Sequence, residues 1–247
     1  MPSFIQLEVA VESVESAHAA EQGGATRVEL CSALDVGGLT PSAGLIAMVR
    51  RRIQIPLHVL IRPRAGGFFY SDDEFDVMRR DILLARQLGA NGVALAVLEA
   101  NGNIDVDRTH VLVESATPMQ VTFHRAFDVA RNRELALPLV FATGATRILT
   151  SGWAATALEG APVLKKLVAA AGPDISIMAA GKVRADNVAA LIRSTGVREV
   201  HANLATDRPM LTRQDSDAIP PDLFNELQKG VSAESVAAFL EAATSAD

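Results

Sequence analysis

Short apolar runs of β-like residues alternate along this chain with longer stretches of helical periodicity. The apolar runs predict strands at 4–9, 26–31, 57–61, 92–97, 119–124, 146–150, 175–180 and 198–202. The helical stretches fall after these strands, at 13–22, 42–52, 72–88, 105–115, 132–142, 156–171, 185–195 and 232–243. Apolar runs of this length, bounded by turn residues, are typical of buried strands. Regular alternation of strands with helices predicts a parallel sheet.

A repeated phrase marks the turns from helix to strand. It reads GGATRVEL, LGANGVAL, TGATRILT and TGVREVHA, and it places a glycine at 24, 89, 144 and 196. Glycine suits the position just past a helix end, so each phrase reads as helix end, turn and strand. Eight strand–helix pairs in 247 residues predict a (β/α)8 TIM barrel that forms a single domain over 1–247. A doubly wound open sheet is the competing fold, but it usually has fewer strands.

Helix-start signals and one long connection complete the layout. Ser71 with Glu74 forms a capping-box signature, and Asp186 and Ser232 are weaker helix-start signals. The segment 206–224 is predicted to be irregular. Long loops of this kind are often functional or disordered, so it is either a lid over the barrel mouth or a solvated connector.

Composition and net charge limit the cellular compartment and the classes of partner that we expect. The net charge is −6 and there is no cluster of Lys and Arg, which argues against nucleic acid. The single cysteine, Cys31, rules out an internal disulfide framework and suits a reducing cytoplasm. The first 20 residues lack the pattern of a signal peptide, and no stretch of about 18 uncharged apolar residues predicts a membrane span. There is no P-loop or dinucleotide fingerprint, so no nucleotide cofactor is expected.

Ionisable residues gather where the predicted strands end. Active sites of TIM barrels form at the carboxyl ends of the strands. The stretch VTFHRAFD, 121–128, is one example, because a buried strand runs directly into three ionisable groups. We predict catalytic roles for Glu8, Glu29, His124 and Arg125, and substrate-binding roles for Arg62, Arg64, Ser151, Lys182 and His201.

Two interpretations of this charged ring stay open. Buried charges are unfavourable unless they pair, and pairing of Glu8 and Glu29 with Arg62 and Arg125 would give a structural salt-bridge layer. Alternatively, the ring is a site for a small anionic ligand that Arg holds while His and Glu move protons. Asp128 either caps the next helix or pairs with Arg125.

Several motifs resemble the CutC family, the so-called copper homeostasis proteins. The stretches are VELCSALDVGGLTPSAGLI, IRPRAGGFFYSDDEF, VTFHRAFD and RILTSGWAATALEG, within roughly 4–205. The resemblance implies a cytoplasmic single-domain TIM barrel that binds copper, with Cys31 as the natural Cu(I) ligand. The chain departs from the family pattern after the last two strands, where it reads Ala179-Ala180-Gly181-Lys182 and His201-Ala202-Asn203.

The residues therefore support two functional hypotheses. In the first, the resemblance implies a copper homeostasis protein, with Cu(I) on Cys31. In the second, the chain is a TIM-barrel enzyme of unknown reaction that acts on a small anionic metabolite. Cu(I) prefers thiolate and thioether ligands, whereas a ring of Arg and Glu suits an anion better. A homodimer is expected only from the general frequency of symmetric oligomers.

Overall fold

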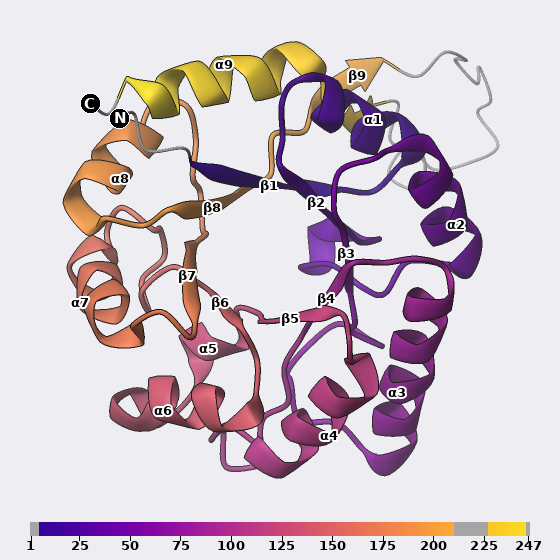
Figure 1. The fold of residues 1–247 in the computed structure, drawn as a ribbon, viewed down its shortest axis with the longest axis vertical. Coiled ribbons are helices and arrows are strands. Elements are labelled where there is room, and N and C mark those ends of the chain that lie inside the picture. The colour runs from indigo at the N-terminus through magenta and orange to yellow at the C-terminus, as the bar shows by residue number, and fades with distance from the viewer. Residues whose placement is uncertain (1–4, 210–226, 246–247) are drawn as a thin grey trace, which may run out of the picture.

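The protein is a closed barrel of eight parallel strands that pair in sequence order, and Figure 1 looks along its axis. The structure is a computed structural model, and it describes residues 5–209 and 227–245. The strands are β1 (Gln6–Val11), β2 (Arg27–Leu30), β3 (Leu57–Leu60), β4 (Gly92–Leu95), β5 (Gln120–Phe123), β6 (Arg147–Thr150), β7 (Ser176–Ala179) and β8 (Glu199–Ala202). The predicted TIM barrel is confirmed, with β1 two residues further along the chain than expected.

Helices form the outer ring of the barrel (Figure 1). They are α1 (Val14–Gln22), α2 (Ala43–Arg52), α3 (Asp72–Gln87), α4 (Val106–Ala116), α6 (Arg133–Thr143), α7 (Ala161–Ala171), α8 (Val188–Thr195) and α9 (Ala233–Thr244). The short helix α5 (Ala126–Val129) and the 3-10 segment η1 (Leu34–Val36) were not predicted. Each is under five residues long, too short to show a hydrophobic period.

Local signals in the sequence explain most of the helix boundaries. Ser71 and Glu74 form the predicted capping box of α3, and Ser232 caps α9. The four repeated glycines all have positive φ, between 74° and 94°, which glycine adopts without strain.

Two helices begin several residues later than predicted. Helix α7 begins at Ala161 because a tight turn precedes it, in which a Cβ on Gly160 would collide with the carbonyl of Ser151. Asp186 does not cap α8; the N-cap is Asn187, whose side chain instead bonds the backbone of Arg184 and Lys182.

The segment after β8 is partly regular. Residues 206–209 form β9 (Thr206–Pro209), which pairs antiparallel with β10 (Leu227–Gly230). The prediction of an irregular segment is therefore wrong for its first four residues, since their backbone groups pair with a strand beyond the segment. Residues 210–224 lie outside the described part of the chain.

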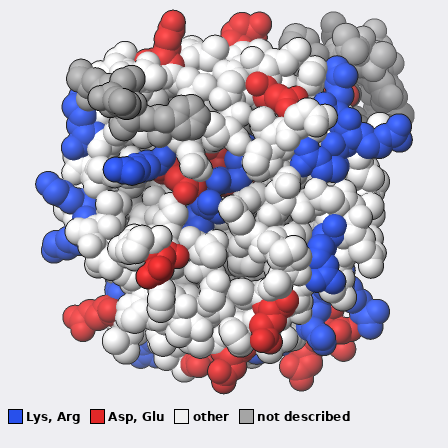
Figure 2. Space-filling view, viewed as in Figure 1, with Lys and Arg blue, Asp and Glu red and all other residues white. Residues whose placement is uncertain are grey.

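The strand side chains that point into the barrel include many polar ones, whereas those that point outward are apolar. Alternate strand residues such as Leu7, Val28 and Val59 belong to the main apolar core, as the two-residue period of a strand requires. The inward positions carry a charged layer, defined here as Glu8, Arg27, Arg147 and Glu199, all less than a tenth exposed. Seen along the same direction as the ribbon, acidic and basic atoms meet near the barrel axis (Figure 2).

The charged layer is internally paired. Arg27 bonds both Glu8 and Glu199, with 2.8 Å between its Nη2 and the Glu199 carboxylate. Arg147 Nε donates to the same Glu199 oxygen at 2.6 Å. Buried charges that pair and hydrogen-bond in this way avoid most of the penalty of leaving water. None of the described helices combines the length and apolarity that crossing a bilayer requires.

Candidate functional site

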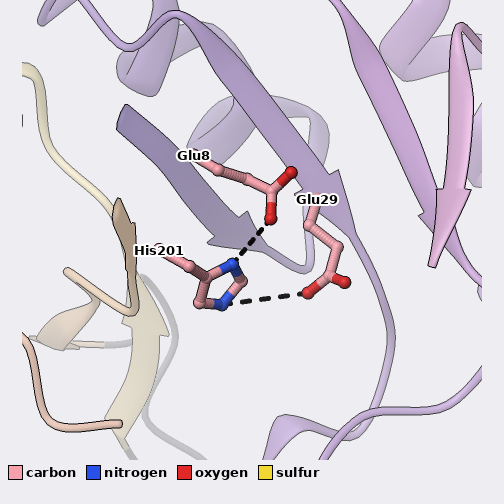
Figure 3. Close-up of side chains that lie close together, drawn as sticks. All are labelled: Glu8, Glu29 and His201. Carbon is pink, nitrogen blue, oxygen red and sulfur yellow. Dashed lines mark hydrogen bonds and ion pairs between the residues drawn. The ribbon is translucent and has the colours of Figure 1, made fainter. Parts of the chain in front are cut away.

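Glu8, Glu29 and His201 form a compact cluster inside the barrel, named here the Glu–His–Glu cluster (Figure 3). They come from β1, β2 and β8, and Glu8 lies directly opposite His201 in the strand register. His201 Nδ1 is 2.8 Å from Glu8 Oε1, and His201 Nε2 is 3.8 Å from Glu29 Oε2. The imidazole therefore lies between two carboxylates, as Figure 3 shows.

The charges around Glu8 and His201 favour an ion pair. Burial alone would raise the pKa of Glu8, but Arg27, His201 and His58 together hold it well below its usual range. Burial alone would lower the pKa of His201, but the hydrogen bond to Glu8 and the charges of Glu29 and Glu8 raise it. We therefore expect an ionised Glu8 beside an imidazolium at His201 near neutral pH.

Glu29 behaves differently from Glu8 although it belongs to the same cluster. Burial, together with the nearby charge of Glu8, raises the pKa of Glu29 to about 7, against the opposing effects of His201 and Arg27. Glu29 is 6% exposed and makes no hydrogen bond with any described residue. A carboxyl group that gains and loses its proton near neutral pH is suited to general acid–base chemistry.

The Glu–His–Glu cluster could also hold a cation. One ligand atom from each residue lies within 4.8 Å of the others. Oxygen and imidazole ligands suit divalent cations, not Cu(I). However, each imidazole nitrogen is directed at a different carboxylate (Figure 3), so a proton on His201 and a bound cation would compete.

His124 lies inside the barrel beyond β5 and is 5% exposed. The backbone N–H of Ala126 donates to its Nδ1 at 3.2 Å. Burial, assisted by the charge of Arg62, lowers the pKa of His124 to about 3. The ring is therefore neutral at physiological pH, which does not fit the proton-transfer role predicted for it.

The arginines beyond β3 hold loops together. Arg62 donates to the carbonyls of Val36, Gly38 and Gly66. Arg64 bonds Glu74 and three carbonyls of its own loop, those of Ala65, Gly67 and Phe69.

The pairing of Glu8 and Glu29 with Arg62 and Arg125, one of the two interpretations left open, is wrong. Glu8 instead bonds Arg27, which stands opposite it on the neighbouring strand. Arg62 and Arg125 lie beyond their strand ends, where loop groups are nearer.

Arg125 is anchored but still reaches solvent. Its Nε donates to Asp128 at 2.8 Å and its Nη2 donates to Ser151 Oγ at 3.0 Å. Asp128 therefore pairs with Arg125 and does not cap the next helix; it also accepts from the backbone N–H of Ser151. The Arg125 side chain is 46% exposed. A guanidinium held in this way can bind an anion without first being ordered.

The loop after β7 passes close to Arg125. A Cβ added at Gly181 would lie 3.0 Å from the Cβ of Ser151 and 3.7 Å from the Cζ of Arg125. Lys182, the next residue, is exposed, has φ of 54°, and forms no ion pair with the described residues. Lys182 thus stays a predicted anion-binding residue.

Cys31 lies in an apolar environment. It packs with Leu60 and Ala94, and its Sγ donates weakly to the Val11 carbonyl at 3.6 Å. Burial, with the nearby carboxylates, raises the pKa of the thiol far above its usual range. Met178, whose thioether is also a soft donor, belongs to a separate cluster and accepts a hydrogen bond from Arg27. A protonated thiol without a second soft ligand does not fit a Cu(I) site.

Sequence reasoning did not single out Arg27, Arg147 and Glu199. A signal was present, because Arg27 lies two residues before Glu29 and Glu199 lies two residues before His201. Residues two apart on a strand share a face, so each points into the barrel with its better recognised neighbour. His58 on β3 is also buried inside the barrel, with its Nδ1 3.8 Å from Glu8.

Comparisons with known proteins agree on one family. The model of the CutC family matches residues 5–206. A family protein CutC from Vibrio vulnificus (strain CMCP6) is 49% identical over 206 residues, which cover 83% of this chain and 82% of the relative. A family protein CutC from Xanthomonas campestris pv. campestris (strain B100) is 51% identical over 197 residues, covering 80% of this chain and 82% of that relative.

A solved structure gives the same result. It is from Streptococcus agalactiae, and its description proposes a copper homeostasis protein CutC. It has 34% sequence identity to this chain and a TM-score of 0.76, and the match covers 80% of this chain and 98% of that one.

Proposed function

The chain belongs to the CutC family, and on that premise we propose that it is an enzyme that performs acid–base chemistry on a small anionic metabolite. The Glu–His–Glu cluster would move the proton, and Arg125 would hold the negative charge of the substrate. The reaction class is a proton transfer at carbon, as in an isomerase or a lyase. Glu29 is the central residue of this proposal.

The proposal rests on one observation, which is that Glu29 is buried, has a raised pKa and lacks a hydrogen bond to the described residues. It is a buried carboxyl with a pKa of about 7 and no hydrogen bond among the described residues. Buried carboxyls in purely structural roles are normally paired, as Glu8 and Glu199 are in this barrel. Glu29 has only the 3.8 Å ion pair with His201 and no hydrogen bond among the described residues, which makes sense if its hydrogen-bond partner is a substrate.

The proposed step needs only groups on this chain and the substrate. The Glu29 carboxylate accepts a proton from a substrate carbon and becomes the neutral acid, and the electron pair stays on the substrate. His201 lies 3.8 Å from Glu29, and its positive charge favours the carboxylate form before the transfer. Glu8 holds the imidazole by a hydrogen bond at 2.8 Å. Return of the proton to a different carbon, or loss of a leaving group, would complete the reaction.

Exchange of substrate hydrogen for deuterium tests this proposal without knowledge of the product. The protein would be incubated in D2O with a panel of hydroxycarboxylates, oxocarboxylates and sugar phosphates, and C–H signals would be followed by proton NMR. We expect enzyme-dependent exchange for at least one compound. Replacing Glu29 with Gln should slow that exchange by about 10²–10⁴-fold, because the general base is lost.

A matched control separates the role of Glu29 from a general effect of removing a carboxylate. Glu15 lies in the first turn of α1, is exposed, and should tolerate Glu15→Gln with full exchange. Exchange that persists in Glu29→Gln, or that is absent from the whole panel, would contradict the proposed function.

Copper homeostasis is the second candidate function. The observation in its favour is the Streptococcus agalactiae relative, whose description proposes that role. Its natural ligand would be Cys31. The buried, apolar surroundings of that thiol speak against it, and for that reason we place this candidate second.

Titration with Cu(I) against a competing chelator distinguishes the two candidates. We expect weak binding that is the same in wild type and Cys31→Ser, since the thiol lacks a second soft ligand and stays protonated. Tight one-to-one binding that disappears in Cys31→Ser but persists in Glu29→Gln would favour the copper role instead.

A further inference from the structure

Two buried polar atoms near the ends of β3 and β5 have no hydrogen-bond partner among the described residues. They are His124 Nε2 and Arg62 Nε. Both side chains are more than nine-tenths buried. Buried polar groups in folded proteins are nearly always paired, so two orphans in one region call for an explanation.

Both side chains lie against one aromatic ring, that of Phe68. The Phe68 ring centroid lies 4.9 Å from that of His124, and the Arg62 guanidinium carbon lies 5.3 Å from the Phe68 centroid. Tyr70 is a neighbour of Arg62. Burial raises the pKa of this phenol to about 12, and the charge of Arg62 and a side-chain hydrogen bond with it oppose the rise. Phe68 itself is half-buried and packs against the core, and its loop follows β3.

A backbone hydrogen bond determines which imidazole nitrogen of His124 carries the hydrogen. Its Nδ1 accepts from the Ala126 N–H at 3.2 Å, so this nitrogen must present its lone pair. In a neutral imidazole the other nitrogen then carries the hydrogen. His124 Nε2 is therefore a donor, and the N–H of Arg62 Nε is a donor as well. Hydrogen-bond donors without partners, next to the positive charge of Arg62, are suited to binding an oxygen atom that carries negative charge.

We propose that His124, with Arg62, forms an acceptor-oxygen site that binds a carboxylate, phosphoryl or carbonyl oxygen of the substrate through His124 Nε2–H. The inference rests on the proposed function, because it assigns a position to that same substrate. His124 would act as a neutral donor, and the proton transfer itself would stay with Glu29. Such a donor stabilises negative charge that grows on the oxygen while the carbon loses its proton.

NMR of the 15N-histidine-labelled protein tests the site directly, with oxalate and inorganic phosphate as probes. The chain has five histidines, and His124→Gln identifies the signals of His124. At pH 7 we expect His124 to carry its hydrogen on Nε2 and to have a bare Nδ1. Oxalate or phosphate should shift the Nε2–H signal in a saturable way. The signals of His58, which is equally buried but lies within the barrel on β3, should stay in place.

Binding by two variants completes the test. His124→Phe keeps the aromatic bulk but removes the donor, and it should weaken binding of the shifting anion about tenfold or more. His124→Gln can present an amide N–H near the same place and should retain most of the affinity. A hydrogen on Nδ1, an Nε2–H signal that neither anion moves, or equal affinity in wild type and His124→Phe would each overturn the inference.

The failure of this inference and that of the proposed function are distinguishable. The NMR readouts require no turnover. Deuterium exchange that survives Glu29→Gln would overturn the proposed proton transfer and leave the binding result at His124 intact. Loss of exchange in Glu29→Gln, together with an unresponsive His124, would retain the reaction and remove the acceptor-oxygen site.

Discussion

Replacing Arg27 with Met is expected to lower the free energy of unfolding by about 3–5 kcal/mol. Arg27 is 4% exposed and bonds two carboxylates, Glu8 and Glu199. Met fills much of the same volume but leaves both carboxylates without their shared cation in a medium that solvates charge poorly. Urea denaturation followed by circular dichroism would measure the loss as a lower midpoint with an unchanged slope.

An exposed arginine supplies the matched control. Arg80 pairs with Asp76 on the surface of α3, where its side chain is 77% exposed. Arg80→Met should leave the unfolding curve unchanged, because water and salt screen such pairs. If Arg27→Met also left the curve unchanged, the charged layer would not stabilise the barrel. In Arg27→Met combined with Glu199→Gln, the loss should be smaller than the sum of the two single losses, since the two residues are direct partners.

Glu29→Gln is expected to stabilise the folded protein at alkaline pH, by about 3 kcal/mol at pH 8. The pKa of Glu29 is about 7 in the folded state, against an ordinary value of 4.5. Between these two values the folded chain keeps a proton that the unfolded chain releases. The free energy of unfolding of the wild type therefore falls as the pH rises from about 4.5 to 7. The variant shows no such fall from this position, because Gln does not titrate.

The measurement compares the unfolding free energies of wild type and Glu29→Gln at pH 5 and pH 8. The difference should be small at pH 5 and should grow at pH 8, and most other titrating groups cancel because both chains share them. Glu15→Gln, the same change at an exposed position, serves as the control. A constant difference for Glu29→Gln would mean that Glu29 has an ordinary pKa.

The barrel could be predicted from the sequence because its signals are local and repeated. The glycine before each second strand, as at Gly89 and Gly144, needs only a left-handed turn, and both residues adopt one. The capping box of Ser71 and Glu74 is equally local. The start of α7 could not be predicted, because it depends on how closely Gly160 approaches Ser151 across a loop.

The residues of the candidate site were predicted from the sequence, but the way in which they pair was not. Glu8, Glu29 and His201 were each predicted from a strand end, and the structure brings all three together. Which charges pair depends on the register between strands, and the order of residues along the chain does not give that register. Arg27 faces Glu8 only because β1 and β2 align those two positions. The protonation of His124 likewise depends on burial and on one backbone N–H, that of Ala126.

The charged layer also bears on how the chain can fold while it is being synthesised. Glu199, on the last strand, bonds Arg27 from 172 residues earlier and Arg147 from 52 residues earlier. Until β8 has left the ribosome, Arg27 has only Glu8 and Arg147 lacks its carboxylate, so a barrel of seven strands would contain the unmatched positive charge of Arg147. Contacts between such distant parts of a chain form late and slowly. The closing strand therefore completes the charge balance, because only a chain that includes β8 can neutralise the interior of the barrel.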